Sequence, residues 1–421
     1  MNNPHAYDAI VIGGGPAGST AAAVLAQKGR NVLVLEREKF PRYHIGESLM
    51  PYCYFPLQRI GVIEQMKTSH FPKKYSVQFV RMNGQVSQPF YFFQHFDHEA
   101  ATTWQVVRSE FDLMLLNNAR AKGAKVMEEM NVRELIRENG AVVGVRAVDK
   151  DKNVQEFRAP ITLDATGRSG LSTTQNRWRV RDAYLNKIAI WTYYKGSKRD
   201  PGLDEGATTV AYLPEKGWFW YIPLPDDVVS VGVVAEKDYL YRDPDVRDPA
   251  AIFQRETKNN KWLEEHLAPG QQFGQYWVTG EFSYRSKHCA EDGLVLIGDA
   301  FAFLDPVFSS GVFLALRSGE MAADAVDAAL KKGDVSAAQF TEYGQQLCKG
   351  IEAMRNIVYA FYDHEFSFRK LAMSYPEARS DLTDCLIGHL FRDFNRLFEA
   401  VGEFAKLPEP LPHGKPLVRT G

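Results

Sequence analysis

The feature that most constrains this chain is a glycine-rich turn near its beginning. The segment "YDAIVIGGGPAGSTAAAVLAQKGRNVLVLERE" spans residues 7–38 and opens with a continuous apolar run, Ala9 to Ile12. Such a run is typical of a strand buried on both faces. Small residues and Leu then favour a helix that stops at Gly29, and Val32 to Leu35 predict a second strand. The order strand, turn, helix, strand indicates a parallel α/β sheet.

The glycines of the turn have the spacing of a dinucleotide-binding site. Gly13, Gly15 and Gly18 form G-x-G-x-x-G, with Ala17 inside the motif. The first glycine permits a tight turn, and the second lets the backbone approach a pyrophosphate at the helix N-terminus. Glu36, at the end of the second strand, has the position of an acid that accepts from a ribose hydroxyl. These five residues predict binding of FAD or NAD rather than NADP.

Composition excludes several other classes of protein. The chain has 421 residues and a formal net charge of -2, so no basic excess exists to neutralise nucleic acid. The 10 histidines are scattered, and none has metal-ligand spacing with a cysteine, so we expect no metal site. No apolar run is long enough for a signal or a transmembrane segment. The cysteines form no C-x-x-C and predict reduced thiols in the cytoplasm; they are Cys53, Cys289, Cys348 and Cys385.

The pattern of strands predicts a discontinuous domain. Residues 75–100 and 185–284 are rich in β-branched and aromatic residues with turn punctuation, so we expect a second, mainly antiparallel sheet that forms a substrate domain. The Rossmann-like cofactor domain would then comprise residues 1–74, 101–184 and 285–345. Residues 346–421 would form a C-terminal helical cap and a loose tail. The predicted fold class is α/β.

The cap carries an apolar stripe at helical spacing. Seven residues fall on one face of a predicted helix, and we interpret them as core packing: Leu390, Phe391, Phe394, Leu397, Phe398, Val401 and Phe404. The final segment, "PEPLPHGKPLVRTG", has too much proline and polar content to pack, which is why we expect a loose tail.

Three further segments indicate which dinucleotide binds. "LVLIGDAFAFLDP" places Asp299 directly after a buried strand, and this resembles the Gly-Asp fingerprint of the glutathione-reductase-type FAD family. The resemblance implies that Asp299 binds the ribityl chain and that Arg108, at the start of a helix, lies beside the flavin. Arg108 as a solvated charge opposite Glu110 is the alternative. "DATG" at 164–167 is similar to a third family segment, and Val132 has the position that lends backbone to the adenine, although an ordinary strand residue is as good a reading.

The segment "GWFWYIPL" at 217–224 narrows the family further. Trp218 and Trp220 belong to W-x-W-x-I-P, which resembles the signature of flavin-dependent halogenases. "FLDPVFSSG" fits that family's F-x-x-P-x-x-S-x-G pattern, and "FPRYHIGESLMP" at 40–51 resembles its segment near the flavin. The second pattern assigns four residues to the site: Phe303, Pro306, Ser309 and Gly311.

Strand alternation predicts what the tryptophans do. Trp218, Trp220 and Ile222 should share one face, with Phe219 and Tyr221 on the other. Two stacked indoles would then form a dry wall that keeps water from a reactive oxygen species. Periodicity alone favours ordinary core filling, and only the combined motifs favour the wall.

The resemblance also implies the chemistry. Reduced FAD reacts with O2 to give a C4a-hydroperoxide, whose terminal oxygen goes to a small organic substrate in a monooxygenase or is attacked by a halide in a halogenase. The hypohalous species then reaches a lysine that forms a haloamine or aims the oxidant. "HFPKKYSVQF" matches the F-x-x-K pattern with Phe71 and Lys74, although Ser76 stands where the family has glycine. Lys74 is therefore the predicted catalytic residue, and a solvated Lys73–Lys74 pair is an equally weighted alternative.

The start of the next predicted helix provides a further hypothesis. The helix over about 310–330 begins after "DPVFSSG", and its N-terminal amides would face the flavin pyrimidine edge, where Gly311 leaves room. The helix dipole would stabilise negative charge there by about 1 kcal/mol. His44 and Glu47 are candidates to titrate near the flavin; the alternative is that Glu47 and Ser48 cap the following helix, which is favoured for Ser48 and left open for Glu47.

Two alternative functions remain open at this level. One is an alkene reductase like the geranylgeranyl reductases, and the other is a flavin-binding protein without its own turnover. No second G-x-G-x-x-G follows a strand, so reduced FAD would come from a separate flavin reductase or from transient nicotinamide binding. The chain is also shorter than many relatives of this family, which would suit a more open site, a carrier-bound substrate or a different reaction.

Overall fold

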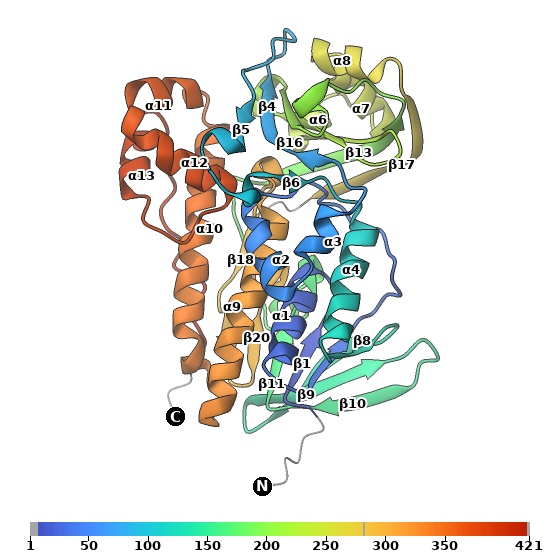
Figure 1. The fold of residues 1–421 in the computed structure, drawn as a ribbon, viewed down its shortest axis with the longest axis vertical. Coiled ribbons are helices and arrows are strands. Elements are labelled where there is room, and N and C mark those ends of the chain that lie inside the picture. Colours follow the sequence, from blue (N-terminus) through green and yellow to red (C-terminus); the bar gives the residue numbers. More distant parts are fainter. Residues whose placement is uncertain (1–6, 281–282, 419–421) are drawn as a thin grey trace.

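The computed structural model describes residues 7–280 and 283–418 (Figure 1). A six-stranded sheet lies at its centre. β19 is antiparallel to its neighbour, and the other strands are parallel. In spatial order the strands are β19 (Ala290–Glu291), β20 (Leu294–Leu296), β11 (Ile161–Asp164), β1 (Ala9–Ile12), β2 (Val32–Leu35) and β7 (Lys125–Met127).

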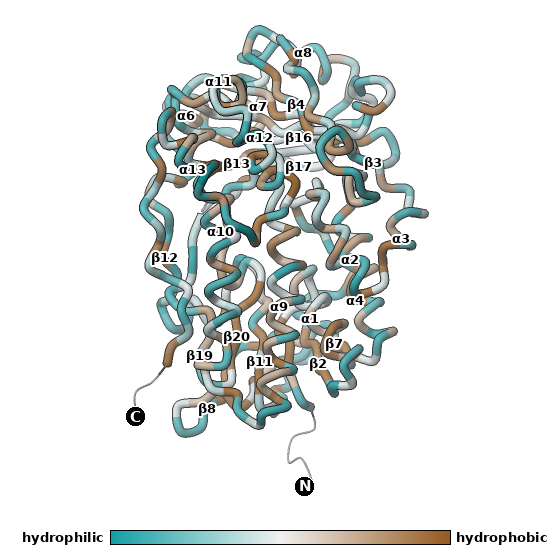
Figure 2. The backbone as a smooth tube through the Cα atoms, turned by 60° about the vertical axis from the view of Figure 1, so that its left-hand side comes forward, coloured by the Kyte–Doolittle hydropathy of each residue, from teal (hydrophilic) through white to brown (hydrophobic). Residues whose placement is uncertain are grey.

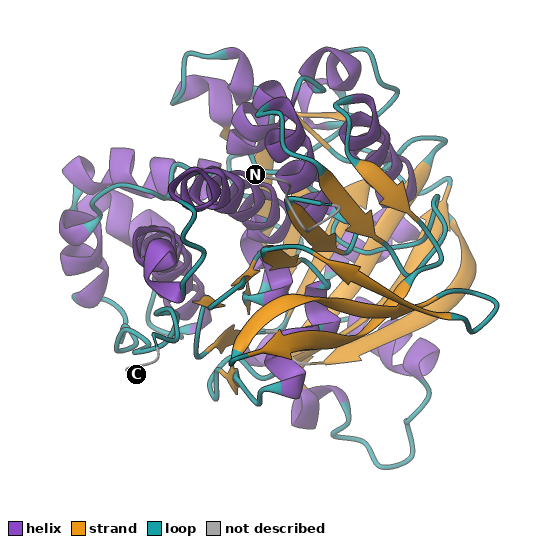
Figure 3. Cartoon of the chain, turned by 90° about the horizontal axis from the view of Figure 1, so that it is seen from below, coloured by secondary structure: helices purple, strands orange, loops and turns teal. Residues whose placement is uncertain are grey.

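The central sheet is covered on both faces, as its apolar strands predict. Ala9 and Val11 pack into a core with the helices, whereas Ile10 and Ile12 pack against a three-stranded antiparallel sheet. Seen from below in Figure 3, helices gather on one side and strands on the other. The helices are α1 (Pro16–Gln27), α4 (Arg108–Ala121) and α9 (Ser310–Lys332), and the small sheet comprises β8 (Asn131–Glu138), β9 (Ala141–Val148) and β10 (Val154–Arg158). The predicted order of strand, turn, helix and strand is confirmed.

A second, seven-stranded sheet lies above the first. All its pairings are antiparallel except β14 with β4. In spatial order it contains β17 (Gln271–Gly280), β13 (Lys187–Lys195), β16 (Val228–Glu236), β15 (Trp218–Pro223), β14 (Thr208–Tyr212), β4 (Ser76–Val80) and β5 (Phe90–Tyr91). The predicted mainly antiparallel sheet is therefore present, and the fold is the mixed α/β fold expected. The exact domain boundaries stay a prediction.

The two faces of this sheet pack into different hydrophobic cores. Its outer face packs against α6 (Lys237–Leu240), α7 (Pro249–Thr257) and α8 (Lys261–Leu267). Its inner face joins the large core that contains α1 and α9. In Figure 2 the loops around α8 are hydrophilic, while hydrophobic segments such as β11 and β20 lie inside.

Short elements connect these layers. They include the paired strands β3 (Lys73–Lys74) and β6 (Thr103–Trp104), the sheet of β12 (Arg179–Arg181), β18 (Tyr284–Ser286) and β21 (Ala302–Phe303), and the helices α2 (Tyr54–Ile60), α3 (Ile63–Lys67) and α5 (Leu171–Gln175).

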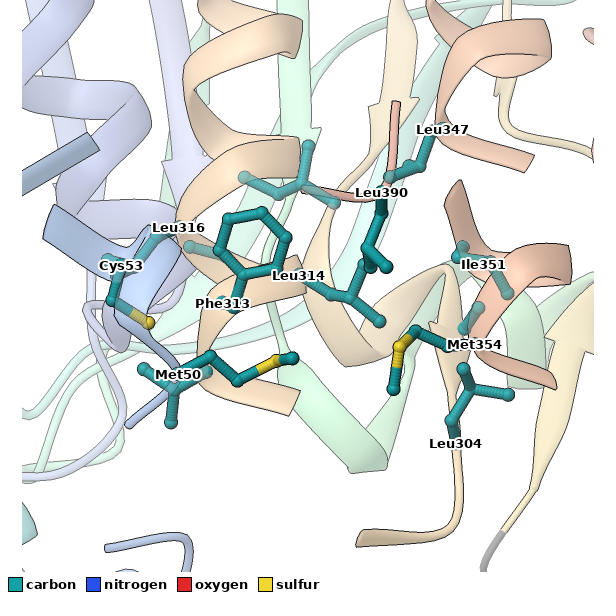
Figure 4. Packing of buried hydrophobic residues seen from close by; sticks show 14 of the residues in the cluster. Met50, Cys53, Leu304, Phe313, Leu314, Leu316, Leu347, Ile351, Met354 and Leu390 are labelled. Carbon is teal, nitrogen blue, oxygen red and sulfur yellow. The ribbon is translucent and has the colours of Figure 1, made fainter. Parts of the chain in front are cut away.

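The C-terminal region differs in part from the prediction. The long helix α10 (Thr341–Tyr362) packs beside α9, and three shorter helices follow: α11 (Phe368–Ser374), α12 (Arg379–Ile387) and α13 (Asn395–Gly402). The apolar stripe is not one helix face, because residues 388–394 are not helical. Gly388 adopts a positive φ of 101° and ends α12. Leu390 nevertheless lies in the core beside Leu314, Leu347 and Ile351 (Figure 4), so the core-packing interpretation is confirmed.

The expectation of a loose tail is wrong for residues 414–417. The amide of Gly414 donates to the Lys287 carbonyl at 2.9 Å, and that of Leu417 donates to Ala290 at 2.7 Å. Proline prevents helix formation here, but it does not prevent extended backbone from pairing with a neighbouring edge. The cysteines are unpaired, as expected. Among the described residues, no helix has the length and apolarity to span a bilayer.

Candidate active site

A cavity of about 630 Å³ runs from the glycine-rich turn to the aromatic strand β15. It is bounded by the central sheet, the start of α9 and the inner face of the seven-stranded sheet. Most of the predicted site residues line it: Gly13, Gly15, Ala17, Glu36, Arg108, Val132, Trp218, Trp220, Asp299, Phe303, Pro306, Ser309 and Gly311. Gly18 and Lys74 are not among its lining residues.

The turn geometry requires its glycines. Gly13 has a φ of +106°, and a Cβ there would lie 2.4 Å from the carbonyl oxygen of Ala165. A Cβ on Gly18 would lie 1.9 Å from the carbonyl oxygen of Gly13. Gly18 therefore lets helix α1 pack against the turn and does not itself line the cavity, and its role in cofactor binding stays a prediction.

Glu36 lies at the end of β2, as predicted. Its Oε2 accepts from the amide of Gly14 at 2.6 Å, and its Oε1 accepts from the amide of Glu38 at 2.8 Å. These bonds fix the carboxylate at the cavity edge. Each oxygen keeps a second lone pair, which is what a ribose hydroxyl needs.

Arg108 is a buried residue at the first position of α4. Its Nε and Nη2 donate to the two carboxylate oxygens of Asp112 at 2.8 and 2.9 Å, and its Nη1 donates to the Ile45 carbonyl at 2.7 Å. The alternative of a solvated charge opposite Glu110 is therefore wrong, because Glu110 pairs with His70 instead. Arg108 presents a fixed positive charge to the cavity.

Asp299 lines the same cavity from the turn after β20. Burial raises the pKa of its carboxyl to about 6, and the charges of Arg168 and Arg108 oppose that rise. Both arginines also line the cavity. A ligand that hydrogen bonds to Asp299 would therefore bind a carboxyl that lies near two positively charged arginines.

The tryptophan strand alternates as predicted. Trp218, Trp220 and Ile222 line the cavity, whereas Phe219 and Tyr221 pack into the outer core. The indoles do not stack: their centroids are 6.2 Å apart and their planes are inclined by 54°. Residues two apart on a twisted strand cannot present parallel rings at stacking distance, so the wall is a tilted pair.

Sequence reasoning missed Trp191, which extends this wall from β13. Trp191 and Trp220 are both register partners of Gly232, where a Cβ would lie 2.2 Å from the Trp220 ring. The missing side chain lets the two indoles sit 6.3 Å apart. The glycine in the alternating segment 228–236 was the available signal.

Arg42 was also missed. It lines the cavity, and its Nη2 lies 3.5 Å from where a Cβ on Gly15 would be. A guanidinium beside the phosphate-binding turn suits a pyrophosphate. It belongs to the segment 40–51 that resembles the flavin-adjacent segment, so position and charge together could have identified it.

The C-terminal helix α10 holds the wall in place. Trp218 Nε1 donates to the Tyr362 hydroxyl at 2.8 Å, and that hydroxyl donates to Asp305 Oδ2 at 2.8 Å. Asp305 is fully buried, and burial raises its pKa to about 6. The indole orientation therefore depends on a helix more than 140 residues away along the chain.

Lys74 lies behind the main cavity, next to a second one of about 30 Å³. The two cavities share the lining residues Thr208, Val210, Val307 and Ser309. Lys74 is 2% exposed, and its Nζ donates to Ser48 Oγ at 2.9 Å and to the Leu49 carbonyl at 3.1 Å. Burial lowers the pKa of its ammonium to about 7. The alternative of a solvated lysine pair is wrong for Lys74, although Lys73 is exposed.

His44 and Glu47 both line the main cavity. Burial lowers the pKa of His44 to about 4 and raises that of Glu47 to about 7. Ser48, expected to cap a helix, instead hydrogen bonds with Thr208 at 2.7 Å and receives the Lys74 ammonium.

The cavity fits FAD. The glycine turn and Arg42 suit a pyrophosphate, Glu36 suits a ribose, and Asp299 lies after the strand where a ribityl chain would pass. The far end, between the start of α9 and the indoles, leaves room for a flat ring. Fold and cavity together define an FAD-binding flavoprotein whose cofactor pocket opens onto an aromatic wall.

Comparison with known proteins identifies the family within that class. The sequence matches the tryptophan halogenase family over residues 8–101 and 94–399, and the chain belongs to this family. It is 30% identical to a 1H-pyrrole-2-carbonyl-[peptidyl-carrier protein] chlorinase of Pseudomonas fluorescens, covering 97% of this chain and 96% of that protein. It is 31% identical to the corresponding brominase of Pseudoalteromonas luteoviolacea, covering 93% and 94%.

Solved structures agree. The flavin-dependent brominase Bmp2 superimposes with a TM-score of 0.85 at 29% identity, covering 94% of this chain and 98% of that one. The myxobacterial chondrochloren halogenase CndH gives 0.79 at 31% identity, covering 95% and 97%. The protein is an FAD-dependent oxidoreductase of the flavin-dependent halogenases, and this favours the main prediction over the alkene reductase and the flavin protein without turnover.

Proposed function

We propose that this protein halogenates an electron-rich aromatic ring that is presented on a carrier protein. The observation that carries the proposal is Lys74, a buried amine set behind a tryptophan-walled FAD cavity. Bound FAD in its reduced form supplies the electrons with which O2 is reduced while halide is oxidised to hypohalous acid. O2 and halide are therefore proposed co-substrates, and a flavin reductase is a proposed partner.

In this proposal the protein keeps water away from the reacting groups and directs the oxidant toward Lys74. The tilted indoles and Ile222 exclude water from the side of the cavity that faces the substrate sheet. The four residues shared by the two cavities form the boundary that the oxidant crosses toward Lys74.

Lys74 is suited to receive a positive halogen. With its pKa lowered to about 7, about half of it is neutral at pH 7, and its two hydrogen bonds use both N–H groups of the neutral amine. The lone pair then attacks the halogen of hypohalous acid: the N–halogen bond forms, the O–halogen bond breaks, and the departing hydroxide takes one N–H proton of the amine and leaves as water. Transfer to the ring regenerates the amine as the ring loses a proton. An amine that only hydrogen bonds the acid would aim it from the same position.

Carrier presentation is supported by the extent of the match to relatives whose names specify a peptidyl-carrier substrate. We also propose a cytoplasmic location, since the cysteines are unpaired and reduced thiols persist there.

The test uses pyrrole-2-carboxylate, free and as a carrier-protein thioester, with chemically reduced FAD, O2 and chloride or bromide. We expect halogenated product from the thioester and at least 100-fold less from the free acid. Lys74→Ala should lose product by at least 100-fold while FAD binding and oxidation of reduced FAD persist; Lys73→Ala is the matched control. Full activity of Lys74→Ala removes Lys74 from the mechanism, and equal use of the free acid removes the carrier.

A further inference from the structure

A short path of hydrogen bonds joins the FAD cavity to the surface. Glu47 lines the cavity and is 3% exposed. Its Oε1 accepts from the Tyr193 hydroxyl at 2.8 Å, which lies 3.0 Å from the Tyr43 hydroxyl. Tyr43 is 43% exposed. Two steps therefore connect a cavity carboxyl with bulk water.

Tyr193 stands at the middle of this path, and Tyr43 is held at its outer end. The Tyr193 hydroxyl is in position to donate either to Glu47 or to Tyr43, and its single proton serves one of the two contacts at a time. The Tyr43 oxygen in turn accepts from Trp191 Nε1 at 2.7 Å, and its ring stacks on Trp277 at 4.6 Å. Tyr193 is therefore the link between Glu47 and the half-exposed Tyr43.

The proposed reaction consumes protons. In balanced form, the aromatic C–H, halide, O2, FADH2 and one proton give the aromatic C–halogen, FAD and two waters. Each turnover consumes one proton, and one more when the reduced flavin enters as its anion. At the buried inner end of the cavity, beside Trp220 and Ile222, a carboxyl linked to solvent can supply these protons.

We propose that Tyr43 and Tyr193 relay protons from solvent to Glu47, and that Glu47 delivers them to the reacting groups in the FAD cavity. The proposal rests on the proposed FAD and O2 chemistry, and it is independent of Lys74 and of the substrate. Glu47 is the group that faces the cofactor, while the tyrosines act through it.

The surroundings of Glu47 suit a carboxyl that gives up a proton and is then reprotonated. It faces Tyr193 from β13, Tyr43 from its own loop, Ser230 from β16 and the Arg108 charge from α4. Burial raises its pKa to about 7, against the hydrogen bonds and that charge. Because Glu47 lines the cavity, a ligand bound there can reach its carboxyl.

The experiment compares Tyr193→Phe, Tyr43→Phe and Glu47→Gln with Tyr194→Phe. Tyr194 is the next residue on β13 and packs on the outer core, so its hydroxyl is a matched control away from the cavity. The FAD-bound protein with 13C-labelled glutamate is titrated by NMR, and Glu47→Gln assigns the signal. We expect a carboxyl titrating near pH 7 in the wild type and a shift in Tyr193→Phe.

The second readout is proton uptake. Protein with reduced FAD is mixed with O2 and a pH indicator in a stopped-flow instrument, with and without bromide. We expect uptake at least 10-fold slower in the three relay variants, with a larger solvent isotope effect, and an unchanged rate in Tyr194→Phe. Wild-type uptake rates in both Tyr193→Phe and Tyr43→Phe would overturn the relay. Oxidation of FADH⁻ by O2 alone also consumes a proton, so this result is informative even if no halogenated product forms.

Discussion

Lys74 allows a quantitative test of the site by protein stability alone. Its folded-state pKa is about 7, against an ordinary value of 10.5. Below pH 7 the folded protein carries a buried ammonium, and this destabilising contribution is fully present. As pH rises toward 10.5 the unfolded chain holds the proton that the folded protein has lost, so the free energy of unfolding rises with pH across this window.

The magnitude follows from the two values. At about 1.4 kcal/mol per pKa unit, the full contribution is about 5 kcal/mol, of which about 3 to 4 kcal/mol disappears between pH 7 and pH 10. Lys74→Met keeps the length of the side chain and removes the titration. Its free energy of unfolding should therefore exceed that of the wild type most at pH 7, offset in part by the two lost hydrogen bonds, and the difference should shrink toward pH 10.

The assay is urea unfolding of both proteins at pH 7, 8, 9 and 10. Lys73→Met, which alters the exposed neighbour, is the control and should follow the wild type. Parallel pH profiles for wild type and Lys74→Met would refute the reasoning, because they would mean that the ammonium is not held in a dry environment.

Two further changes probe the cofactor cavity and its wall. Gly311→Val should lower FAD affinity at least 10-fold in a folded protein, since a Cβ there meets no protein atom within 4 Å and the branched side chain would enter the cavity; unchanged flavin absorbance after gel filtration would count against this. Tyr362→Phe should lower the free energy of unfolding by about 1 to 3 kcal/mol, because it leaves Trp218 Nε1 and Asp305 without their shared partner. The loss should be larger at pH 8 than at pH 5: the Tyr362 hydrogen bond lowers the already raised pKa of Asp305, and removing it makes ionisation in the folded state costlier. Equal losses at both pH values in urea unfolding would contradict that assignment.

Local patterns sufficed for much of the fold. The apolar runs of β1 and β2 and the glycines between them are short-range features whose geometry leaves few alternatives. The facing of Trp218 and Trp220 followed in the same way from strand alternation. Their tilt did not, because it depends on the twist of a sheet whose strands come from distant parts of the chain.

The features that the sequence did not predict depend on contacts between segments far apart in the chain. Trp191 reaches the wall only because β13 and β15 both flank β16, a neighbour relation that no local pattern encodes. The hold of Tyr362 on Trp218 and the docking of residues 414–417 are likewise contacts between distant segments. The sequence could not show that Lys74 is buried while Lys73 is exposed, because the two lysines are adjacent and identical. Only the placement of strand β3 in the fold distinguishes them.

Strand β15 lies between the cavity and the outer core, and this position affects which substitutions the protein can accept during evolution. Alternate residues along it belong to the reaction chamber and to the outer core, so the two can vary independently under selection as long as the register holds. Substitutions at the chamber positions can reshape what the enzyme accepts without eroding the scaffold, and repairs to the scaffold can accumulate at the others. A one-residue insertion in the strand would exchange both sets at once. Evolution along this strand should therefore proceed by replacement and almost never by a change of length.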